Sequence, residues 1–132
     1  MTHRFEFDHD HRILLAVLEG DIQDADLLAF DANSREYAIK FTPSGGITDF
    51  SGVTAFSASG EVVRTIAQTP PSYKTPIPWL LVAPRDVHFG MARMYQIIAS
   101  DVRPRLKVVR SFEEALTALG VQNPKFEPAE SE

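Results

Sequence analysis

The sequence predicts a single α/β domain with a mixed sheet of about five strands and about four helices. The chain has 132 residues, and domains commonly contain about 100–150 residues. Short apolar runs alternate with segments in which apolar residues recur at helical spacing, and this alternation is typical of a largely parallel sheet covered by helices. The chain opens with two short apolar segments separated by a few polar residues, which indicates a hairpin at one side of the sheet.

The opening hairpin is predicted from residues 3–7 and 12–19, because the polar residues between them suit a tight turn. A helix is expected over residues 23–38. The apolar residues near helical spacing in that segment are Ala25, Leu28, Ala32 and Tyr37. The glycine-containing segment at 42–46 is then expected to break the chain, and residues 47–50 look like a short strand.

The second half of the chain continues the alternation of strands and helices. In chain order we expect a helix at 61–68, a strand at 79–83, a helix at 87–100, a strand at 106–109 and a helix at 112–119. Four prolines exclude regular structure from the connector at 70–78. Ser111 and Gly120 are suited to start and end the last helix. The domain is therefore expected to span residues 1–120, followed by a flexible tail at 121–132.

Composition and charge exclude several classes of function. The sequence has no cysteine, a net charge of -5 and a pI near 5.3. The missing cysteines exclude disulfides, thiolate zinc sites and thiol nucleophiles, and the acidic balance argues against nucleic acid as a partner. No apolar run approaches the roughly 20 residues that span a bilayer, and the polar start does not resemble a signal peptide. We expect a cytoplasmic protein without a membrane span.

Motifs of enzyme chemistry are absent from the sequence. His9, Asp10 and His11 are residue types that bind metals, but spacing suggests no third ligand, and a solvated turn explains the segment. Neither a G-x-S-x-G elbow nor a phosphate-binding loop occurs. We therefore expect a protein that is not an enzyme and that needs no cofactor or metal.

Residues 88–99 form the predicted helix with the widest apolar arc. Phe89, Ala92 and Gln96 share one face. The residues that widen the apolar arc are Met91, Met94, Tyr95 and Ile98. Packing against the sheet explains such an arc. The alternative is an exposed surface for a partner, a second copy of the chain or a small apolar ligand.

Residues 49–60, DFSGVTAFSASG, carry the best-defined candidate site. A strand is expected to run into a serine-rich turn and then into a helix, with Ser59 at the N-cap and Gly60 at the first helical position. The free backbone N–H groups at such a helix start attract anions, so a phosphate on Ser59 would be accommodated there. A plain serine cap explains the same residues.

In this position the segment resembles the STAS domain, the family of sulfate-transporter and anti-sigma-factor-antagonist domains. The family carries a motif like D-L-S-x-V-x-F-x-D-S-S-G-L between its third strand and second helix. The matching residues here are Asp49, Ser51, Val53, Ser59 and Gly60. The stretches APRDVHFGMARMY and VVRSFEEAL look more specifically like small uncharacterised bacterial STAS/SEC14-like proteins. The resemblance implies a STAS-like fold over residues 1–120.

The chain departs from the family at the serine that the family phosphorylates. An ungapped match places Ala58 at that first serine of the pair, and Ser57 at the acidic residue before it. Ser59 matches the second serine and is the candidate phosphoacceptor. Glu61 would repel a phosphate, which carries about -1.5 to -2 charges, so the sequence weighs against a switch at Ser59.

The resemblance implies a non-enzymatic regulatory module that binds a protein partner, with an anti-sigma-type kinase as a candidate. The expected partner surface consists of Ser57, Ala58, Gly60, Glu61 and Arg64. The alternative function is the binding of a small apolar or lipid-like ligand, as SEC14-like proteins do. The expected pocket for that ligand is lined by Phe56, Trp79, Phe89 and Met94. A cavity of about 300 Å³ or more among these side chains would favour the alternative.

Overall fold

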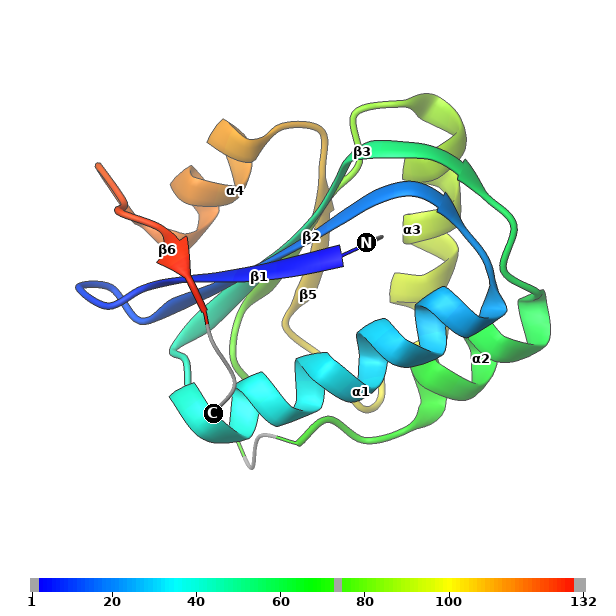
Figure 1. Ribbon diagram of the computed structural model, residues 1–132, viewed down its shortest axis with the longest axis horizontal. Coiled ribbons are helices and arrows are strands. Elements are labelled where there is room, and N and C mark those ends of the chain that lie inside the picture. Colours follow the sequence, from blue (N-terminus) through cyan, green and yellow to red (C-terminus); the bar gives the residue numbers. More distant parts are fainter. Residues whose placement is uncertain (1–2, 73–74, 130–132) are drawn as a thin grey trace.

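The structure is a computed structural model that describes residues 3–72 and 75–129 (Figure 1). Its elements, in chain order, are β1 (His3–Asp8), β2 (Ile13–Ile22), α1 (Asp24–Phe41), β3 (Gly45–Phe56), α2 (Gly60–Gln68), β4 (Trp79–Val82), α3 (Asp86–Ile98), β5 (Leu106–Val109), α4 (Phe112–Leu119) and β6 (Glu127–Pro128). Within these residues, four helices and one six-stranded mixed sheet confirm the predicted α/β domain. None of these helices combines the length and the apolar character needed to cross a membrane.

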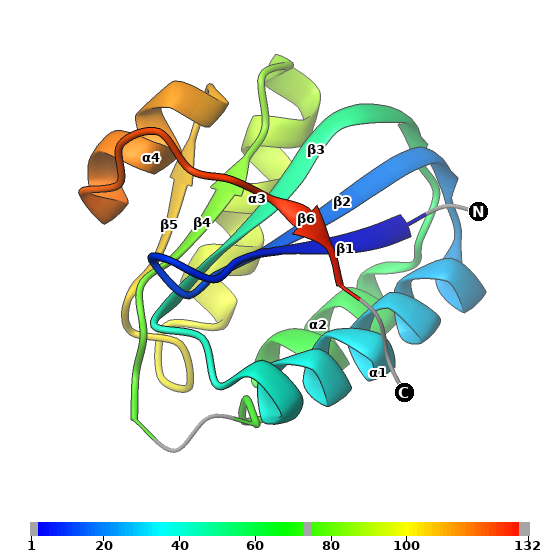
Figure 2. The same cartoon turned by 60° about the vertical axis from the view of Figure 1, so that its left-hand side comes forward.

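The strands lie in the order β5-β4-β3-β2-β1-β6 (Figure 2). Four neighbouring strands, β2, β3, β4 and β5, run parallel to one another. Strand β1 runs antiparallel to β2. In that antiparallel pair His3 lies opposite Leu18 and Asp8 lies opposite Ile13, so the predicted hairpin is confirmed. A helix connects each strand of the parallel set to the next, as parallel pairing requires a crossover.

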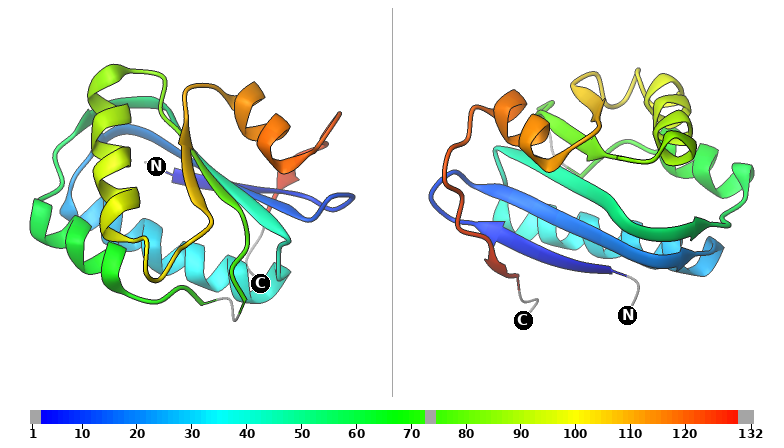
Figure 3. Two further views of the ribbon diagram at one scale, coloured as in Figure 1. Left: turned by 180° about the vertical axis from the view of Figure 1, so that it is seen from behind. Right: turned by 90° about the horizontal axis from the view of Figure 1, so that it is seen from above.

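Helices α1, α2 and α3 cover one face of the sheet, and α4 covers the other. Successive side chains of a strand point to opposite faces, and both faces of β2 are buried. Leu14 and Ala16 pack with aromatic residues of α1, Leu18 packs with α1 and α2, and Leu15 packs with α4. Seen from behind, α3 and α4 lie on opposite sides of β4 and β5 (Figure 3). The core therefore has two layers, with the sheet between them.

Strand β3 is much longer than the four residues predicted at 47–50. It begins at Gly45, inside the segment expected to break the chain, and pairs with β2 as far as Phe56. Gly46 is buried because the ring of Trp79 packs directly against its backbone, where a Cβ atom would overlap the ring. Glycine here marks a close approach of two elements rather than a turn.

Strand β6 lies in the segment for which a flexible tail was expected. Glu127 pairs with Phe7 of β1, on the edge that the hairpin leaves open. Val121 is buried, and the ring of Phe126 meets that of Phe112 edge-on, with 5.9 Å between the centroids. Burial of these apolar side chains holds the segment on the domain. Residues 130–132 of the predicted tail lie outside the described residues.

The ends of α4 agree with the local signals in the sequence. Ser111 Oγ accepts a hydrogen bond of 3.1 Å from the backbone N–H of Glu114. The Glu114 carboxylate accepts a bond of 3.1 Å from the backbone N–H of Arg110, one residue before the N-cap. Gly120 ends the helix with a left-handed φ of 70°, which glycine adopts at little cost.

His88 makes the stability of the fold dependent on pH. Its side chain is buried in the first turn of α3, and burial lowers the pKa of His88 below the ordinary value of 6.5, with the charge of Arg85 lowering it further. The folded state therefore keeps the ring neutral at a pH where the unfolded chain already binds a proton.

Above pH 6.5, the neutral His88 ring makes its full contribution to the free energy of unfolding. This contribution falls as the pH drops below that value and through the folded-state pKa of His88, by at most about 1.4 kcal/mol per pH unit for one proton. Urea unfolding from about pH 7.5 to about pH 5.5 measures this loss. Burial also lowers the pKa of His3, so the difference between wild type and His88→Gln isolates His88. Equal pH dependence in the two proteins would contradict the prediction.

Candidate functional site

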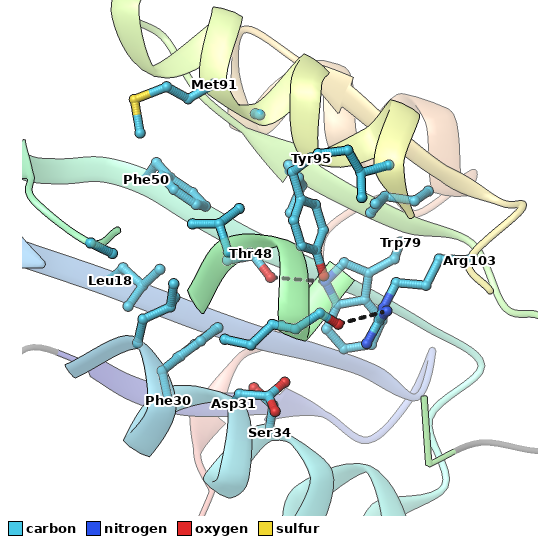
Figure 4. Close-up of a pocket in the computed structure, with 18 of the residues that line it drawn as sticks. Leu18, Phe30, Asp31, Ser34, Thr48, Phe50, Trp79, Met91, Tyr95 and Arg103 are labelled. Carbon is cyan, nitrogen blue, oxygen red and sulfur yellow. Dashed lines mark hydrogen bonds between the residues drawn. The ribbon is translucent and has the colours of Figure 1, made fainter. Parts of the chain in front are cut away.

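A cavity of about 330 Å³ lies inside the domain, between the sheet and the layer formed by α1, α2 and α3 (Figure 4). Side chains from β2, α1, β3, α2, β4, α3 and β5 line it, and most of them are apolar. Natural ligand sites occupy about 300–1,000 Å³ and are walled mainly by apolar and aromatic side chains. The cavity therefore has the size and the lining of a site for a small ligand.

Aromatic rings set the distance between α1 and the sheet. Phe41 stacks on Phe7 with 4.6 Å between the ring centroids, and Phe30 stacks on Phe5 at 5.7 Å. Between these two rings of α1, the small side chain of Ala38 is buried and borders the cavity. Large rings on either side of a small residue leave a space that side chains do not fill, whereas protein interiors are otherwise close-packed.

The indole of Trp79 forms one wall of the cavity and is held in a single orientation. Its Nε1–H donates a hydrogen bond of 2.9 Å to the hydroxyl oxygen of Thr48, which is buried (Figure 4). The missing side chain at Gly46 makes room for the ring. Because Thr48 satisfies the one polar group of the indole, the ring offers an apolar surface to a ligand.

Polar lining side chains gather where α1 meets the C-terminal end of α2. Arg35 donates from Nε to the carboxylate of Asp31 at 3.0 Å, and from Nη1 to the carbonyl oxygen of Pro70 at 2.8 Å. Arg103 donates from Nη1 to the carbonyl oxygen of Thr69 at 3.0 Å. Because Thr69 and Pro70 are consecutive residues, both guanidinium groups are anchored at the same end of the cavity.

The cavity reaches solvent beside α2 and α3. Gly60, Arg64 and Met94 line it and are also exposed, with 64% of Met94 accessible. Gly60 and Arg64 belong to the partner surface predicted from the sequence, and so does the lining residue Ala58. The two predicted sites, the partner surface and the ligand pocket, therefore meet at the N-terminal half of α2.

The structure brings together three of the four residues predicted for the ligand pocket, namely Phe56, Trp79 and Met94. Phe89 does not line the cavity. It packs into the core beside β4, and the guanidinium of Arg110 lies 3.9 Å above its ring. Phe89 precedes the lining residue Met91 by two positions and so points roughly 200° away from it around the helix.

The sequence interpretation missed the wall that α1 contributes. That wall consists of Leu27, Phe30, Asp31, Ser34, Arg35 and Ala38, which follow helical spacing at i, i+3, i+4, i+7, i+8 and i+11. Of the four residues chosen from the sequence, Ala25, Leu28 and Ala32 are exposed, and Leu28 is 51% exposed. Only the fourth, Tyr37, faces the sheet, where its ring centroid lies 4.6 Å from that of Phe5. Three polar residues on the inner face obscured the helical pattern of apolar residues. A helix that borders a cavity does not need a fully apolar stripe.

Ser59 lies at the N-cap of α2, as predicted, and its side chain is exposed. Its Oγ accepts a hydrogen bond of 3.2 Å from the backbone N–H of Val62. Of the predicted partner surface around it, Ser57, Gly60, Glu61 and Arg64 are exposed and Ala58 is half-buried. The turn is therefore accessible to a partner.

Carboxylates surround this helix start. Asp24 accepts a hydrogen bond of 2.6 Å from the backbone N–H of Ser59, and Asp21 accepts one of 2.8 Å from the hydroxyl of Ser57. The bond from Ser57, followed by one from Gln23, lowers the pKa of Asp21 and keeps it ionised. A phosphate on Ser59 would meet these negative charges as well as Glu61, and like charges disfavour the modification.

Replacing Ser59 by alanine should lower the free energy of unfolding by about 1 kcal/mol, the usual cost of losing a serine N-cap. Urea unfolding followed by circular dichroism measures this change. Ser100→Ala is the matched control, because Ser100 is exposed and lies outside helix α3. If both variants were as stable as the wild type, the hydrogen bond to Val62 would not stabilise α2.

The histidine-containing turn between β1 and β2 is explained by local contacts. Nδ1 of His11 lies 2.7 Å from a carboxylate oxygen of the buried Asp8, and the ring of His9 meets Phe7 and Phe41 edge-on. Across residues 3–72 and 75–129, no three side chains of metal-binding type are grouped to hold an ion.

No protein-family model matches the sequence, and no curated protein matches it. The resemblance to the STAS family therefore rests on the residues quoted for it. Several of these residues have structural roles within β3 and at the start of α2. Asp49 accepts hydrogen bonds from the backbone and the hydroxyl of Ser51, Val53 is buried, and Ser59 caps α2.

Proposed function

We propose that the protein binds a small apolar or lipid-like ligand in the cavity between the sheet and helices α1, α2 and α3. The observation that carries this proposal is the cavity itself, which has a volume of about 330 Å³. It exceeds the roughly 300 Å³ at which ligand sites begin. Three of the residues predicted for such a pocket, Phe56, Trp79 and Met94, lie around it.

The energetics of the cavity support an apolar occupant. Transfer of apolar surface out of water contributes about 25 cal/mol per Å², and aromatic walls add dispersion contacts that an unfilled cavity forgoes. Phe30, Phe50, Phe56 and Tyr95 present rings to the space beside Trp79. A flexible apolar chain would make these contacts without displacing a side chain.

The polar lining supports binding rather than catalysis. Among the described residues, no histidine borders the cavity, and the Asp31 carboxylate is paired with Arg35. A hydroxyl of the lining, such as that of Ser34, therefore has no imidazole beside it to act as its base. We further propose that binding takes place in the cytoplasm, since a chain without cysteine suits a reducing compartment.

Titration with decanol tests the proposal, because Trp79 is the only tryptophan of the chain and lines the cavity. The expected result is a saturable change of tryptophan fluorescence at one ligand per chain. Native mass spectrometry of the purified protein provides a second readout, in which a copurified small molecule would support the proposal. A fluorescence signal that does not saturate, together with no binding heat in calorimetry, would overturn it.

A regulatory interaction of STAS type is the second candidate function. The observation in its favour is that Ala58, Gly60 and Arg64 belong both to the exposed turn and to the cavity lining. A protein bound at this turn would therefore contact the mouth of the ligand site. Co-purification from the native host tests this function, with loss of the partner expected for Arg64→Glu and retention for Lys107→Glu. Light scattering would identify a second copy of the chain as that partner.

A further inference from the structure

We infer that the ligand is a single-chain amphiphile with an anionic headgroup, and that this headgroup lies against Arg35 and Arg103. The inference rests on the proposed function. It adds the charge of the ligand's headgroup and the orientation of the ligand in the cavity. Its apolar chain would extend from the arginines towards Trp79 and the rings around it. The arguments are the charge of the lining, the unused hydrogen-bond donors of the two arginines and the volume available.

The charge of the cavity is opposite to that of the whole chain. Among the described residues that line it, the charged ones are Asp31, Arg35, Arg64 and Arg103. Three positive charges and one negative charge thus border the cavity, whereas the chain as a whole carries -5. A low-dielectric site with a positive excess favours an anion.

Arg35 has a hydrogen-bond donor that lacks an acceptor. Nε is bound to Asp31 and Nη1 to the carbonyl oxygen of Pro70. Nη2 is buried and has no hydrogen-bond partner in residues 3–72 and 75–129. A buried N–H that lacks an acceptor is unfavourable. Protein atoms cover Nη2, so the guanidinium has to turn towards the cavity before a headgroup oxygen accepts this bond.

Arg103 adds a second positive charge at the same end. Its Nη1 donates to the carbonyl oxygens of Ile66, Ala67 and Thr69 at 3.4, 3.3 and 3.0 Å. Its other nitrogens donate no hydrogen bond within the described part of the chain. The carbonyl groups of α2 thus fix the orientation of the guanidinium and leave donors for a ligand, which is how arginine binds carboxylates and phosphates.

The volume limits the apolar part of the ligand. About 330 Å³ is close to the lower limit for ligand sites, so one acyl chain suits the cavity better than two. A carboxylate and a phosphate monoester both satisfy the two arginines. Decanoate and decyl phosphate are therefore the two anionic probes, and decanol is the neutral probe with the same chain.

The experiment is a tryptophan-fluorescence titration of the full chain with each probe below its micelle concentration. We expect the anionic probe with the higher affinity to bind at least about tenfold more tightly than decanol. A difference of this size corresponds to the contribution of one charge-assisted hydrogen bond or more. The ratio of decanoate to decyl phosphate then distinguishes a fatty acid from a phosphorylated lipid. The preference for the anion should weaken at high salt, because part of it is electrostatic.

Arg35→Gln should remove most of the preference for the anion over decanol, and Arg103→Gln should reduce the preference in the same direction. Arg93→Gln is the matched control, since Arg93 is exposed on α3 and does not line the cavity. Because Arg35→Gln also breaks the bonds to Asp31 and Pro70, unfolding curves of each variant accompany the titrations, and Arg35→Lys should retain part of the preference.

The outcomes separate this inference from the proposed function. Equal affinity for decanol and both anions would overturn the anionic headgroup while the apolar site stands. An anion preference that survives in both Arg35→Gln and Arg103→Gln would also overturn it. Failure of all three probes to bind would overturn the proposed function itself.

Discussion

Replacing Gly46 by alanine is expected to lower the free energy of unfolding by about 3 kcal/mol or more, at the upper end of overpacking effects. The added Cβ would overlap the ring of Trp79, closer than any real Cβ contact. The ring does not move away cheaply, because its Nε1–H is bound to the buried Thr48 and the indole forms a wall of the cavity. Urea unfolding measures the loss, and tryptophan fluorescence reports displacement of the ring.

Gly90→Ala is the control for this substitution. Gly90 lies within α3, and a Cβ added there would meet no atom within 4 Å. The same change should therefore raise stability there by up to about 1 kcal/mol, because alanine favours a helix more than glycine does. If Gly46→Ala were as stable as the wild type, Trp79 would not pack against Gly46 as the structure places it.

Replacing Ala38 by phenylalanine is expected to weaken the binding of decanol at least about tenfold. Ala38 faces the sheet from α1, is buried and borders the cavity, so a ring at this position would occupy the space that a ligand needs. Stability should stay within about 1 kcal/mol of the wild type or rise, since filling a cavity adds contacts without replacing existing ones. Fluorescence titration and urea unfolding measure the two effects.

Ala32→Phe is the matched control, because Ala32 lies on the exposed face of the same helix. It introduces the same ring and should leave decanol binding unchanged. Undiminished binding in Ala38→Phe would place the ligand outside the cavity. A loss of binding that is equal in both variants would indicate a general disturbance of α1.

The elements that could be predicted from the sequence are those set by local signals. Ser59 and Ser111 were expected to cap helices, and Gly120 was expected to end one, because each acts on backbone groups within a few residues. The continuous apolar run at 79–83 likewise identifies a strand buried on both faces, and β4 occupies Trp79–Val82. Alternation of these elements is enough to predict the fold class.

The remaining features depend on contacts between distant parts of the chain. Gly46 belongs to a glycine-containing segment that is typical of a turn, but it lies in strand β3. The reason is the packing of Trp79 against it, which the local sequence does not indicate. The sequence at Glu127–Pro128 has no strand pattern of its own. These residues form β6 because one edge of β1 is left without a neighbouring strand by the hairpin, and because Phe126 packs against the core next to them. Two-residue pairing of this kind has no signature in a single sequence.

The candidate pocket was predicted in part for the same reason. Phe56, Trp79 and Met94 were identified by residue type, but Phe89 was included although its position on α3 turns it away from the cavity. Arg35 and Arg103 come from segments far apart in sequence and donate to neighbouring carbonyl groups just after α2, those of Pro70 and Thr69. Their convergence follows from the three-dimensional arrangement alone.

A crystal structure of the protein grown with decanol would locate the ligand directly. We expect electron density for one apolar chain between the indole of Trp79 and the ring of Phe30, with the helices α1, α2 and α3 in their present positions. Helices that instead close onto the sheet and leave no space there, or decanol bound only on the outer surface, would contradict the proposal that this cavity is a ligand site.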